Sequence, residues 1–342
     1  MAFDNIRLEK GMYREAGKSF TQVLERLDPS EGYKGSALEG TDAFQRQLKR
    51  FGIRCKGPAS DCVEKFFRTS DSAVLFPEYI ARTVRQGMEE DSILSSLVAT
   101  TTTIDAMDYR SVYSEPAEED IRLARVTEGA QIPATRIATS DHLIPLYKRG
   151  RMLVASYEAL RFQKLDLFSV ILRQIGNHIQ QMHVADAVQV LTDGDGNDNA
   201  AEVFSVGTAP MGGDAGTLSY DRLVEFWSQF DPYTMNTLVV SPQCLPDILK
   251  LVQMQDAAAG LNFHGTGKLV TPMGAQLLRT CAVTDSGLFI GLDNRYALEM
   301  VQAGEVSVEY DKLIDRQLER AAITSISGFA KICTEACKVL KI

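Results

Sequence analysis

Apolar residues return at helical spacing in the N-terminal part of the chain. Phe20 and Leu24 belong to one such series, and Phe44 and Leu48 belong to a second. Because residues three or four positions apart lie on the same face of a helix, each series predicts a short helix with one buried face. A stretch rich in glycine separates the two. The pattern therefore predicts an N-terminal helical segment at residues 1–70 that is separate from the rest of the chain.

The pattern becomes extended after the next helix. Apolar periodicity predicts a helix over residues 78–97, and the threonines that follow favour a strand, because β-branched side chains fit extended backbone. Two extended arms follow at residues 107–115 and 137–155. The insert between them, residues 116–136, is too polar for its tip to be buried in the chain's own core. We interpret this part as a long hairpin that reaches a neighbouring chain.

One long helix is predicted next, over residues 156–191. This stretch contains no proline and a single glycine, Gly176, and its apolar residues return every three or four positions. At 1.5 Å per residue the helix would be roughly 50 Å long. Phe162, Phe168 and Met182 lie on this spacing, so we expect them to pack in the core. A turn rich in aspartate and glycine then ends the helix.

The last part of the chain alternates between short helices and β-rich runs, which indicates a compact α+β domain. The predicted elements are, in order, helix 218–230, strand 237–240, helix 243–256, and strands 277–283 and 288–292. Further strands are predicted near the C-terminus at 306–310, 321–326 and 329–333. A polar link, residues 311–320, follows the first of these.

Charge is distributed unevenly over the 342 residues. The chain holds 36 Lys and Arg against 45 Asp and Glu, which gives a formal net charge of −9. Residues 1–70 hold 13 basic and 10 acidic residues, so this segment is +3 and the remainder is −12. Because nucleic-acid affinity depends largely on Lys and Arg that neutralise phosphates, a body this acidic is not expected to bind DNA tightly or directly.

The sequence gives little support for a membrane-spanning segment or for a functional role of the cysteines. No stretch approaches the roughly 20 apolar residues that cross a bilayer, and the start of the chain lacks the apolar core of a signal peptide, so the protein is expected to stay in the cytoplasm where it is made. The six cysteines include no C-x-x-C pair. We therefore expect buried thiols rather than a zinc ribbon or a redox motif.

Asp193, Asp195 and Asp198 are the sharpest candidates for chemistry, because carboxylates at alternate positions hold calcium in loop sites. The pattern fails where such a loop needs glycine and glutamate, since Asp198 and Phe204 occupy those positions. The two histidines of the long helix are five residues apart, whereas zinc ligands on one helix are four apart. We predict no metal, no cofactor and no catalytic residue. A metal-dependent enzyme that uses these aspartates is the alternative from a different functional class.

Several stretches, in this order, resemble parts of the Hong Kong 97 fold of tailed-phage major capsid proteins. They are PEYIARTVRQGMEEDSILSSL (77–97), KRGRMLVASYEALR (148–161), VLTDGDGNDNAAEVF (190–204), LVVSPQCLPDILKL (238–251), and the C-terminal stretch that starts with GLDNRYALEM and ends with CKVL (291–340). The resemblance covers about residues 72–342. It depends on the order of the stretches more than on any one of them.

The resemblance implies an α+β chain with a Hong Kong 97-like capsid fold. Its parts would be an N-arm, an extended hairpin loop, a spine helix that belongs to a peripheral domain, an axial domain, and C-terminal strands of the peripheral domain. In the same order these parts would occupy residues 71–104, 105–155, 156–199, 200–293 and 294–342. The helical segment at 1–70 would precede them, as an internal scaffold-like domain of the kind found in some relatives.

The resemblance also implies a structural role without enzymatic activity or cofactor. Such subunits form pentamers and hexamers that build an icosahedral phage head around double-stranded DNA. The implied partners are further copies of the chain, a portal protein, and scaffold or decoration proteins, with DNA enclosed but not bound by sequence. The implied location is the virion, assembled in the host cytoplasm. An encapsulin, the shell protein of a bacterial nanocompartment, is the alternative with the same fold.

Charged residues of both signs on the hairpin are the candidates for contacts between copies, because mixed charges can set the register of an interface. These candidates are Arg122, Arg125, Glu128, Arg136, Lys148, Arg149 and Arg151. A charged hairpin that is merely solvated is the alternative for any one of them.

Overall fold

The computed structural model describes residues 2–15, 18–90, 92–106, 108–114, 137–139, 142–214, 216–255 and 269–342 of the chain. Contacts divide the chain into two compact units, each built from three stretches. Unit 1 comprises Met1–Ser92, Lys148–Gln180 and Gly304–Ile326, and unit 2 comprises Ile93–Tyr147, Gln181–Ala303 and Ser327–Ile342. Helices and strands are mixed along the chain, as expected for the α+β class.

Two short helices of unit 1 lie where the apolar spacing predicts them, α1 (Phe20–Leu27) and α2 (Ala43–Arg50). Each begins with a reciprocal cap. In α1, the Ser19 hydroxyl accepts from the Gln22 N–H at 3.3 Å and the Gln22 side chain accepts from the Ser19 N–H at 3.0 Å. Short 3-10 helices precede, separate and follow them: η1 (Ala2–Asn5), η2 (Lys10–Arg14), η3 (Ser30–Tyr33) and η4 (Val63–Phe67).

Helix α3 (Ser70–Glu89) both begins and ends about eight residues before the predicted helix 78–97. Its start is set by Thr69, whose hydroxyl accepts from the N–H of Ser72 at 3.1 Å. The three residues before Pro77 are buried, and this burial supports a helix that continues through the proline. A 3-10 helix, η5 (Leu94–Ser96), stands where the last predicted turns would be.

The long helix predicted over 156–191 is two helices. They are α4 (Tyr157–Phe162) and α5 (Leu165–Asp193). The break lies where the chain pairs with a distant segment: the Val63 N–H donates to the Gln163 carbonyl at 3.0 Å. Next to it, the Leu165 N–H donates to the Asp61 carbonyl at 2.8 Å. The prediction of one helix was wrong because these partners lie outside the helical sequence.

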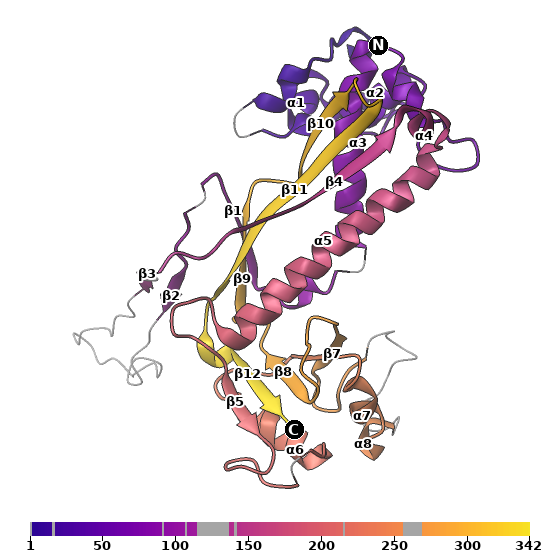
Figure 1. The fold of residues 1–342 in the computed structure, drawn as a ribbon. Coiled ribbons are helices and arrows are strands. Elements are labelled where there is room, and N and C mark those ends of the chain that lie inside the picture. The colour runs from indigo at the N-terminus through magenta and orange to yellow at the C-terminus, as the bar shows by residue number, and fades with distance from the viewer. Residues whose placement is uncertain are drawn as a thin grey trace, which may run out of the picture. The chain divides into compact units, whose positions relative to one another are not determined.

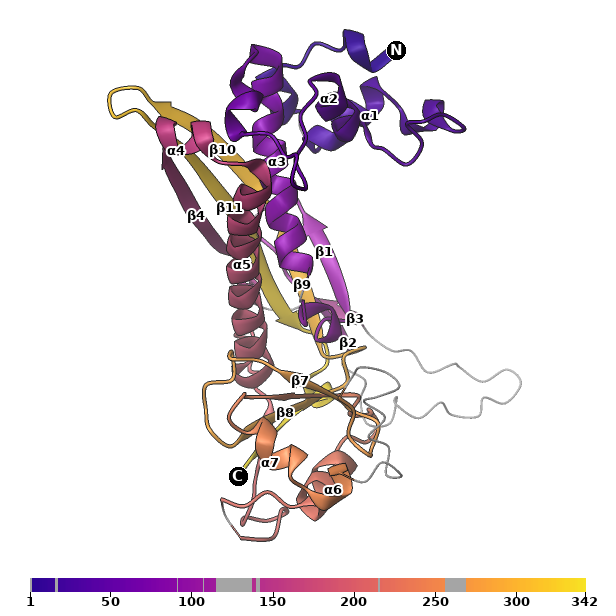
Figure 2. The ribbon, with the colours of Figure 1, turned by 90° about the vertical axis from the view of Figure 1, so that its right-hand side faces the viewer.

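Helices α3 and α5 lie side by side in unit 1 (Figures 1 and 2) and approach closely at two glycines. A Cβ atom on Gly176 would lie 2.1 Å from the Val84 carbonyl oxygen, and one on Gly87 would lie 2.3 Å from the Arg173 carbonyl oxygen. Glycine is therefore needed at both positions for the backbones to reach this distance. Gly176 interrupts the apolar pattern but not the helix.

Strand β11 (Leu318–Lys331) pairs with β4 (Tyr147–Ser156) and, antiparallel, with β10 (Ser307–Leu313), as Figure 1 shows. The polar link predicted at 311–320 is therefore mostly strand. Asp311 faces Arg320 and Lys312 faces Glu319, and the ion pairs measure 2.8 Å. Opposite charges across the two strands stabilise the pairing, which explains why a polar stretch is extended. The strands predicted at 321–326 and 329–333 are one strand.

One hydrophobic core joins the N-terminal segment to the rest of unit 1. Phe20, Leu24 and Phe44 of this segment belong to the same cluster as residues of α3, α5 and β11. Leu24 is fully buried. The boundary at residue 70 therefore separates stretches of sequence but does not separate two cores.

Unit 2 contains the base of the predicted hairpin. Strand β1 (Thr100–Ile104) pairs in parallel with β9 (Leu298–Ala303), and β11 pairs antiparallel with the other edge of β9. Strands β2 (Val112–Ser114) and β3 (Ile137–Thr139) form an antiparallel pair, as expected for two arms of a hairpin. The insert 116–136 lies outside the described residues.

A second sheet of unit 2 has the order β5-β12-β8-β6-β7. Its strands are β5 (Glu202–Ser205), β6 (Thr237–Val240), β7 (Gln276–Arg279), β8 (Leu288–Leu292) and β12 (Cys337–Lys341). Helices α6 (Tyr220–Ser228), α7 (Leu245–Leu249) and α8 (Val252–Gln255) accompany it. Every residue of β6 is buried, which is why its apolar run is so clear in the sequence. The helix predicted at 243–256 is the two short helices α7 and α8.

Candidate subunit interface

The interface candidates on β4 lie on opposite faces of the strand. Side chains alternate between the two faces of a strand, so Lys148 shares one face with Met152 and Val154, whose side chains are 54% and 52% exposed. Arg149 and Arg151 share the other face with residues that pack on the core of unit 1. Lys148 and the two arginines therefore lie on opposite faces of β4, which the pattern of charges in the sequence does not indicate.

Arg151 contacts the long helix. One guanidinium nitrogen of Arg151, Nη1, lies 3.2 Å from Nδ1 of His178, which is exposed on α5. A neutral His178 can accept this hydrogen bond through Nδ1, and the bond then holds the Arg151 side chain over α5. Arg149 is half-buried. The remaining candidates lie outside the described residues; they are Arg122, Arg125, Glu128 and Arg136.

Large apolar side chains are exposed on α4 and α5. Phe162 is 75% exposed and Leu167 is 60% exposed, and Val170 and Ile171 lie on the same face of α5 as Leu167. Core packing was expected for Phe162 and Met182, but both are exposed, whereas Phe168 is buried as expected. The error arises because the helical spacing shows which residues share a face but not whether a neighbour covers it. Contiguous exposed apolar residues are typical of surfaces that partners cover.

A buried carboxylate holds the base of the hairpin. Glu299, on β9, accepts hydrogen bonds from the hydroxyls of Thr102 at 2.5 Å, Tyr109 at 2.7 Å and Ser111 at 2.9 Å. Burial raises the pKa of Tyr109, and the neighbouring carboxylate raises it further, so the phenol stays protonated and donates. The Tyr109 carbonyl accepts from the Ile144 N–H at 2.9 Å, which joins both arms of the hairpin to β9. No sequence motif indicated this role for Glu299.

The aspartates after α5 close the helix. One carboxylate oxygen of Asp195 accepts from the Lys331 N–H at 2.9 Å, and the other accepts from the backbone and side chain of Asn197. The Lys331 ammonium donates to the carbonyls of Leu191 and Asn199 at 3.1 and 2.8 Å, so a cation caps the C-terminus of α5. Burial lowers the pKa of Lys331, a shift that Cys337 and Asp195 oppose. Within the described residues, no group of three Asp, Glu, His or Cys side chains is placed to hold a metal ion.

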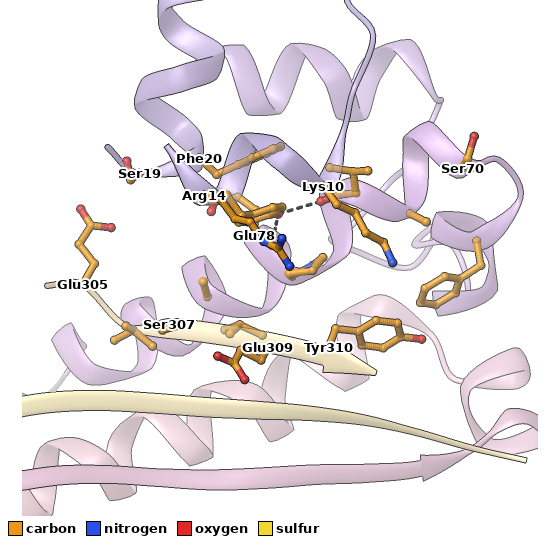
Figure 3. Close-up of a pocket in the computed structure, with 18 of the residues that line it drawn as sticks. Lys10, Arg14, Ser19, Phe20, Ser70, Glu78, Glu305, Ser307, Glu309 and Tyr310 are labelled. Atoms are coloured by element: carbon orange, nitrogen blue, oxygen red, sulfur yellow. Dashed lines mark hydrogen bonds between the residues drawn. The ribbon is translucent and has the colours of Figure 1, made fainter. Parts of the chain in front are cut away.

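A cavity of about 740 Å³ opens in unit 1 between η2, α3 and β10. Figure 3 shows side chains from all three elements around it. Tyr13 forms part of its wall: the Tyr13 hydroxyl donates to the Val74 carbonyl at 2.7 Å and accepts from the Glu78 N–H at 3.1 Å. Burial, and the charge of Glu78, raise the pKa of Tyr13 well above its usual range. The phenol therefore stays neutral and keeps η2 bonded to α3.

Comparison with known proteins gives matches to shell proteins. A family model described as phage capsid protein matches residues 140–326, more than half of the chain. Comparison with curated proteins gives no match. None of the described helices is long and apolar enough to span a membrane.

Solved structures of three particles resemble the fold. The virus-like particle from Pyrococcus furiosus has 12% identity and a TM-score of 0.51, over 78% of this chain and 99% of that one. Mycobacterium phage Che8 has 12% identity and a TM-score of 0.51, over 73% and 91%. The capsid of an empty GTA particle has 15% identity and a TM-score of 0.52, over 73% and 89%. At such low identity these likenesses establish the fold, which is the one that the sequence resemblance implied.

Proposed function

The chain belongs to the phage capsid protein family and has the Hong Kong 97-like fold of major capsid proteins, and from this premise we propose that its copies form the pentamers and hexamers of an icosahedral phage head. The family model covers β4, α4, α5, β9, β10 and the first part of β11. The proposal rests mainly on this match. Rings of identical subunits with head-to-tail contacts close by rotation, and closed rings then tile a shell.

The surfaces of unit 1 support an assembly role. The outward face of β4 and one face of α5 carry large exposed apolar side chains, Met152, Val154 and Leu167 among them. An isolated soluble chain gains nothing from exposing these residues, whereas neighbouring copies would bury them. The charged residues of the hairpin, including Lys148 and Arg149, would then set the register between copies. In this arrangement the extended hairpin of one copy lies over the next.

The interior of the head would hold double-stranded DNA. With a net charge of −9, the chain is suited to enclosing the genome without binding it by sequence. The further partners in this proposal are a portal protein and scaffold or decoration proteins. The subunit itself would act as a structural protein of the virion, assembled in the host cytoplasm, with no reaction and no cofactor of its own.

An encapsulin-type shell is the second candidate. The observation that favours it is the fold itself, which an encapsulin would share and which matches the virus-like particle from Pyrococcus furiosus over 99% of that chain. The long polar insert at 116–136 and the helical segment at 1–70 favour the phage head. Neighbouring genes separate the two: portal, protease and terminase genes accompany a phage capsid gene, whereas a cargo enzyme gene accompanies an encapsulin gene.

Negative-stain electron microscopy of the chain expressed alone tests assembly directly. Closed shells or ring-shaped capsomers are expected. Intact mass measured on the same particles reports whether the N-terminal segment is retained. A chain that stays monomeric at high concentration would contradict the proposal.

A further inference from the structure

The cavity of unit 1 carries uncompensated positive charge. Six basic and three acidic residues line it, and two of the basic residues, Lys18 and Lys312, are paired with Glu15 and Glu319 outside the lining. Glu78 and Glu305 are each neutralised by an arginine, at 2.8 and 2.7 Å. Arg14 and Arg68 are exposed at the cavity and form no ion pair with any residue that the structure describes. Their guanidinium groups are therefore available to a negatively charged partner.

One side of the cavity is the edge of a sheet. Residues of β10 from Ser307 to Tyr310 line it, and among the described strands β10 pairs with β11 alone. Figure 3 shows Ser307, Glu309 and Tyr310 along this strand, with Arg14 and Lys10 across the cavity. An edge strand leaves a row of N–H and C=O groups unpaired, and an extended peptide can add to it as a further strand.

The wall of the cavity suits a peptide better than a phosphate chain. Phe20, Val74, Pro77 and Val308 contribute apolar surface between the basic residues. A nucleic-acid backbone would place charged phosphates against these side chains, whereas a peptide can bury apolar side chains there and direct its carboxylates outward. The expected ligand is therefore an acidic, extended peptide with some apolar residues.

The chain itself contains one such segment. Residues 115–120, with the sequence EPAEED, carry four carboxylates and no basic residue, and no other six-residue stretch of the chain carries as many acids. Ile121 follows directly. The segment directly follows Ser114, the last residue of β2, so its six residues allow Asp120 to lie at most about 20 Å from the end of that strand.

We propose that residues 115–120 of a second copy of the chain dock in this cavity, along the free edge of β10, with their carboxylates beside Arg14 and Arg68. The inference rests on the proposed function, because the second copy is the neighbour in the capsid. It assigns the N-terminal segment a role as part of the receptor for the neighbour's hairpin. Pro116 is compatible with this geometry, since a strand added at an edge needs only alternate N–H groups.

A charge exchange tests the pairing. The variant Arg14→Glu/Arg68→Glu and the variant Glu118→Lys/Glu119→Lys are each expected to lower the yield of rings or shells about tenfold, because like charges then meet at the interface. Combining all four substitutions restores opposite charges in exchanged positions and is expected to recover most of the wild-type yield. Particles are counted by electron microscopy after size-exclusion chromatography.

The matched control is Lys34→Glu/Lys49→Glu. Both lysines are exposed in the N-terminal segment and neither lines the cavity, so this variant makes the same change in net charge elsewhere. Its particle yield is expected to match the wild type. Thermal unfolding of each variant as a dilute monomer verifies folding, and its Tm is expected to be unchanged because the contact forms between copies.

Several outcomes would overturn the inference. They are wild-type yield from the cavity variant, loss of yield that the combined variant does not recover, and normal particles that hold less nucleic acid, which would indicate a phosphate backbone as the occupant. A monomer Tm that falls in the cavity variant and in the hairpin variant, and recovers in the combined variant, would indicate that residues 115–120 dock in the cavity of their own chain. If wild-type chains never assemble, the proposed function fails as well; if they assemble and the cavity variants do too, this inference fails alone.

Discussion

Single residues decide how closely the elements of unit 1 approach. Gly87 and Gly176 have no side chain to separate α3 from α5, and Thr69 and Ser19 determine where α3 and α1 begin. These effects depend on one or two atoms each. Single charges matter in the same way on the second arm of the hairpin, where Lys148, Arg149 and Arg151 lie close together in the sequence.

Replacing Gly176 by alanine should destabilise unit 1. The added Cβ would lie 2.1 Å from the Val84 carbonyl oxygen, so α3 and α5 must move apart, at a cost of about 1–3 kcal/mol. Urea unfolding followed by circular dichroism measures this cost. The control is Gly11→Ala, because a Cβ at Gly11 has no atom within 4 Å. Equal stability of the two variants would contradict the close approach.

Reversing the charge of Arg149 should weaken assembly without unfolding the subunit. On the proposed interface, Arg149→Glu places a negative charge where the neighbouring copy meets a positive one. Particle yield is expected to fall while the monomer Tm stays near that of the wild type. Lys34→Glu, which changes the charge of the N-terminal segment instead, should leave the yield unchanged. Normal yield from Arg149→Glu would argue against a role in assembly.

Elements are held in place by partners that are remote in sequence. The base of the hairpin depends on Glu299 of β9, and the end of α5 depends on Lys331 of β11. In the second sheet, Asp293 follows β8 and accepts from the Thr234 N–H and from the Arg295 guanidinium, at 3.2 and 2.7 Å. One carboxylate thus joins the end of β8 to the segment that leads into β6.

This contact should make unit 2 sensitive to acid. Burial alone would raise the pKa of Asp293, but the hydrogen bond from Arg295, together with backbone N–H groups, lowers it below its usual value of 3.8. A carboxyl whose pKa is depressed in the folded state contributes stability above its unfolded pKa and loses it as the pH falls through the folded value. The wild type should therefore lose stability below about pH 4, and Asp293→Asn should lose less over that range. Urea unfolding at pH 7 and pH 3 measures the free energy of unfolding of both proteins. An equal loss of stability in the wild type and in Asp293→Asn between the two pH values would contradict this account.

At the scale of the whole molecule, the N-terminal segment is part of the core of unit 1 and not an appendage. Phe20, Leu24 and Phe44 share one cluster with α3 and α5. The Arg82 guanidinium extends this link: it pairs with Asp42 at 2.5 Å and donates to the Thr21 hydroxyl at 2.8 Å. Removal of this segment would expose the surface that it covers, so we expect assembled particles to contain it.

Leu24→Ala tests this integration. Leu24 is fully buried in the shared core, so truncation should cost about 2–5 kcal/mol and lower the cooperative unfolding transition of unit 1. Leu27→Ala, on the same helix but 49% exposed, is the matched control and should cost far less. If Leu24→Ala affected only a minor early transition, the segment would be a separate folding unit, as the sequence pattern alone suggested.

The local sequence pattern was sufficient to predict the position of those elements whose bounds are not changed by contacts with distant residues. Helices α1 and α2 and the buried strands β6 and β8 lie where spacing predicts them, because capping residues and apolar runs are properties of a few consecutive residues. The fold class and the family also followed from the sequence, through the order of resembling stretches. Of the interface candidates, Lys148, Arg149 and Arg151 lie on β4 of the structure, and their part in an interface is still a prediction.

Contacts between distant segments decided the rest. The break between α4 and α5 depends on backbone bonds to Asp61 and Val63, and the role of Glu299 depends on three hydroxyls that are remote in the chain. Phe162 is exposed because no described part of the chain covers it. Sequence periodicity indicates which side chains share a face, but burial and hydrogen bonding are set by whichever remote residues occupy the space beside that face. For this reason the sequence by itself determined the class of fold and the family, and only the tertiary structure decided which charges are buried, where the long helix breaks and which edge of the sheet is free.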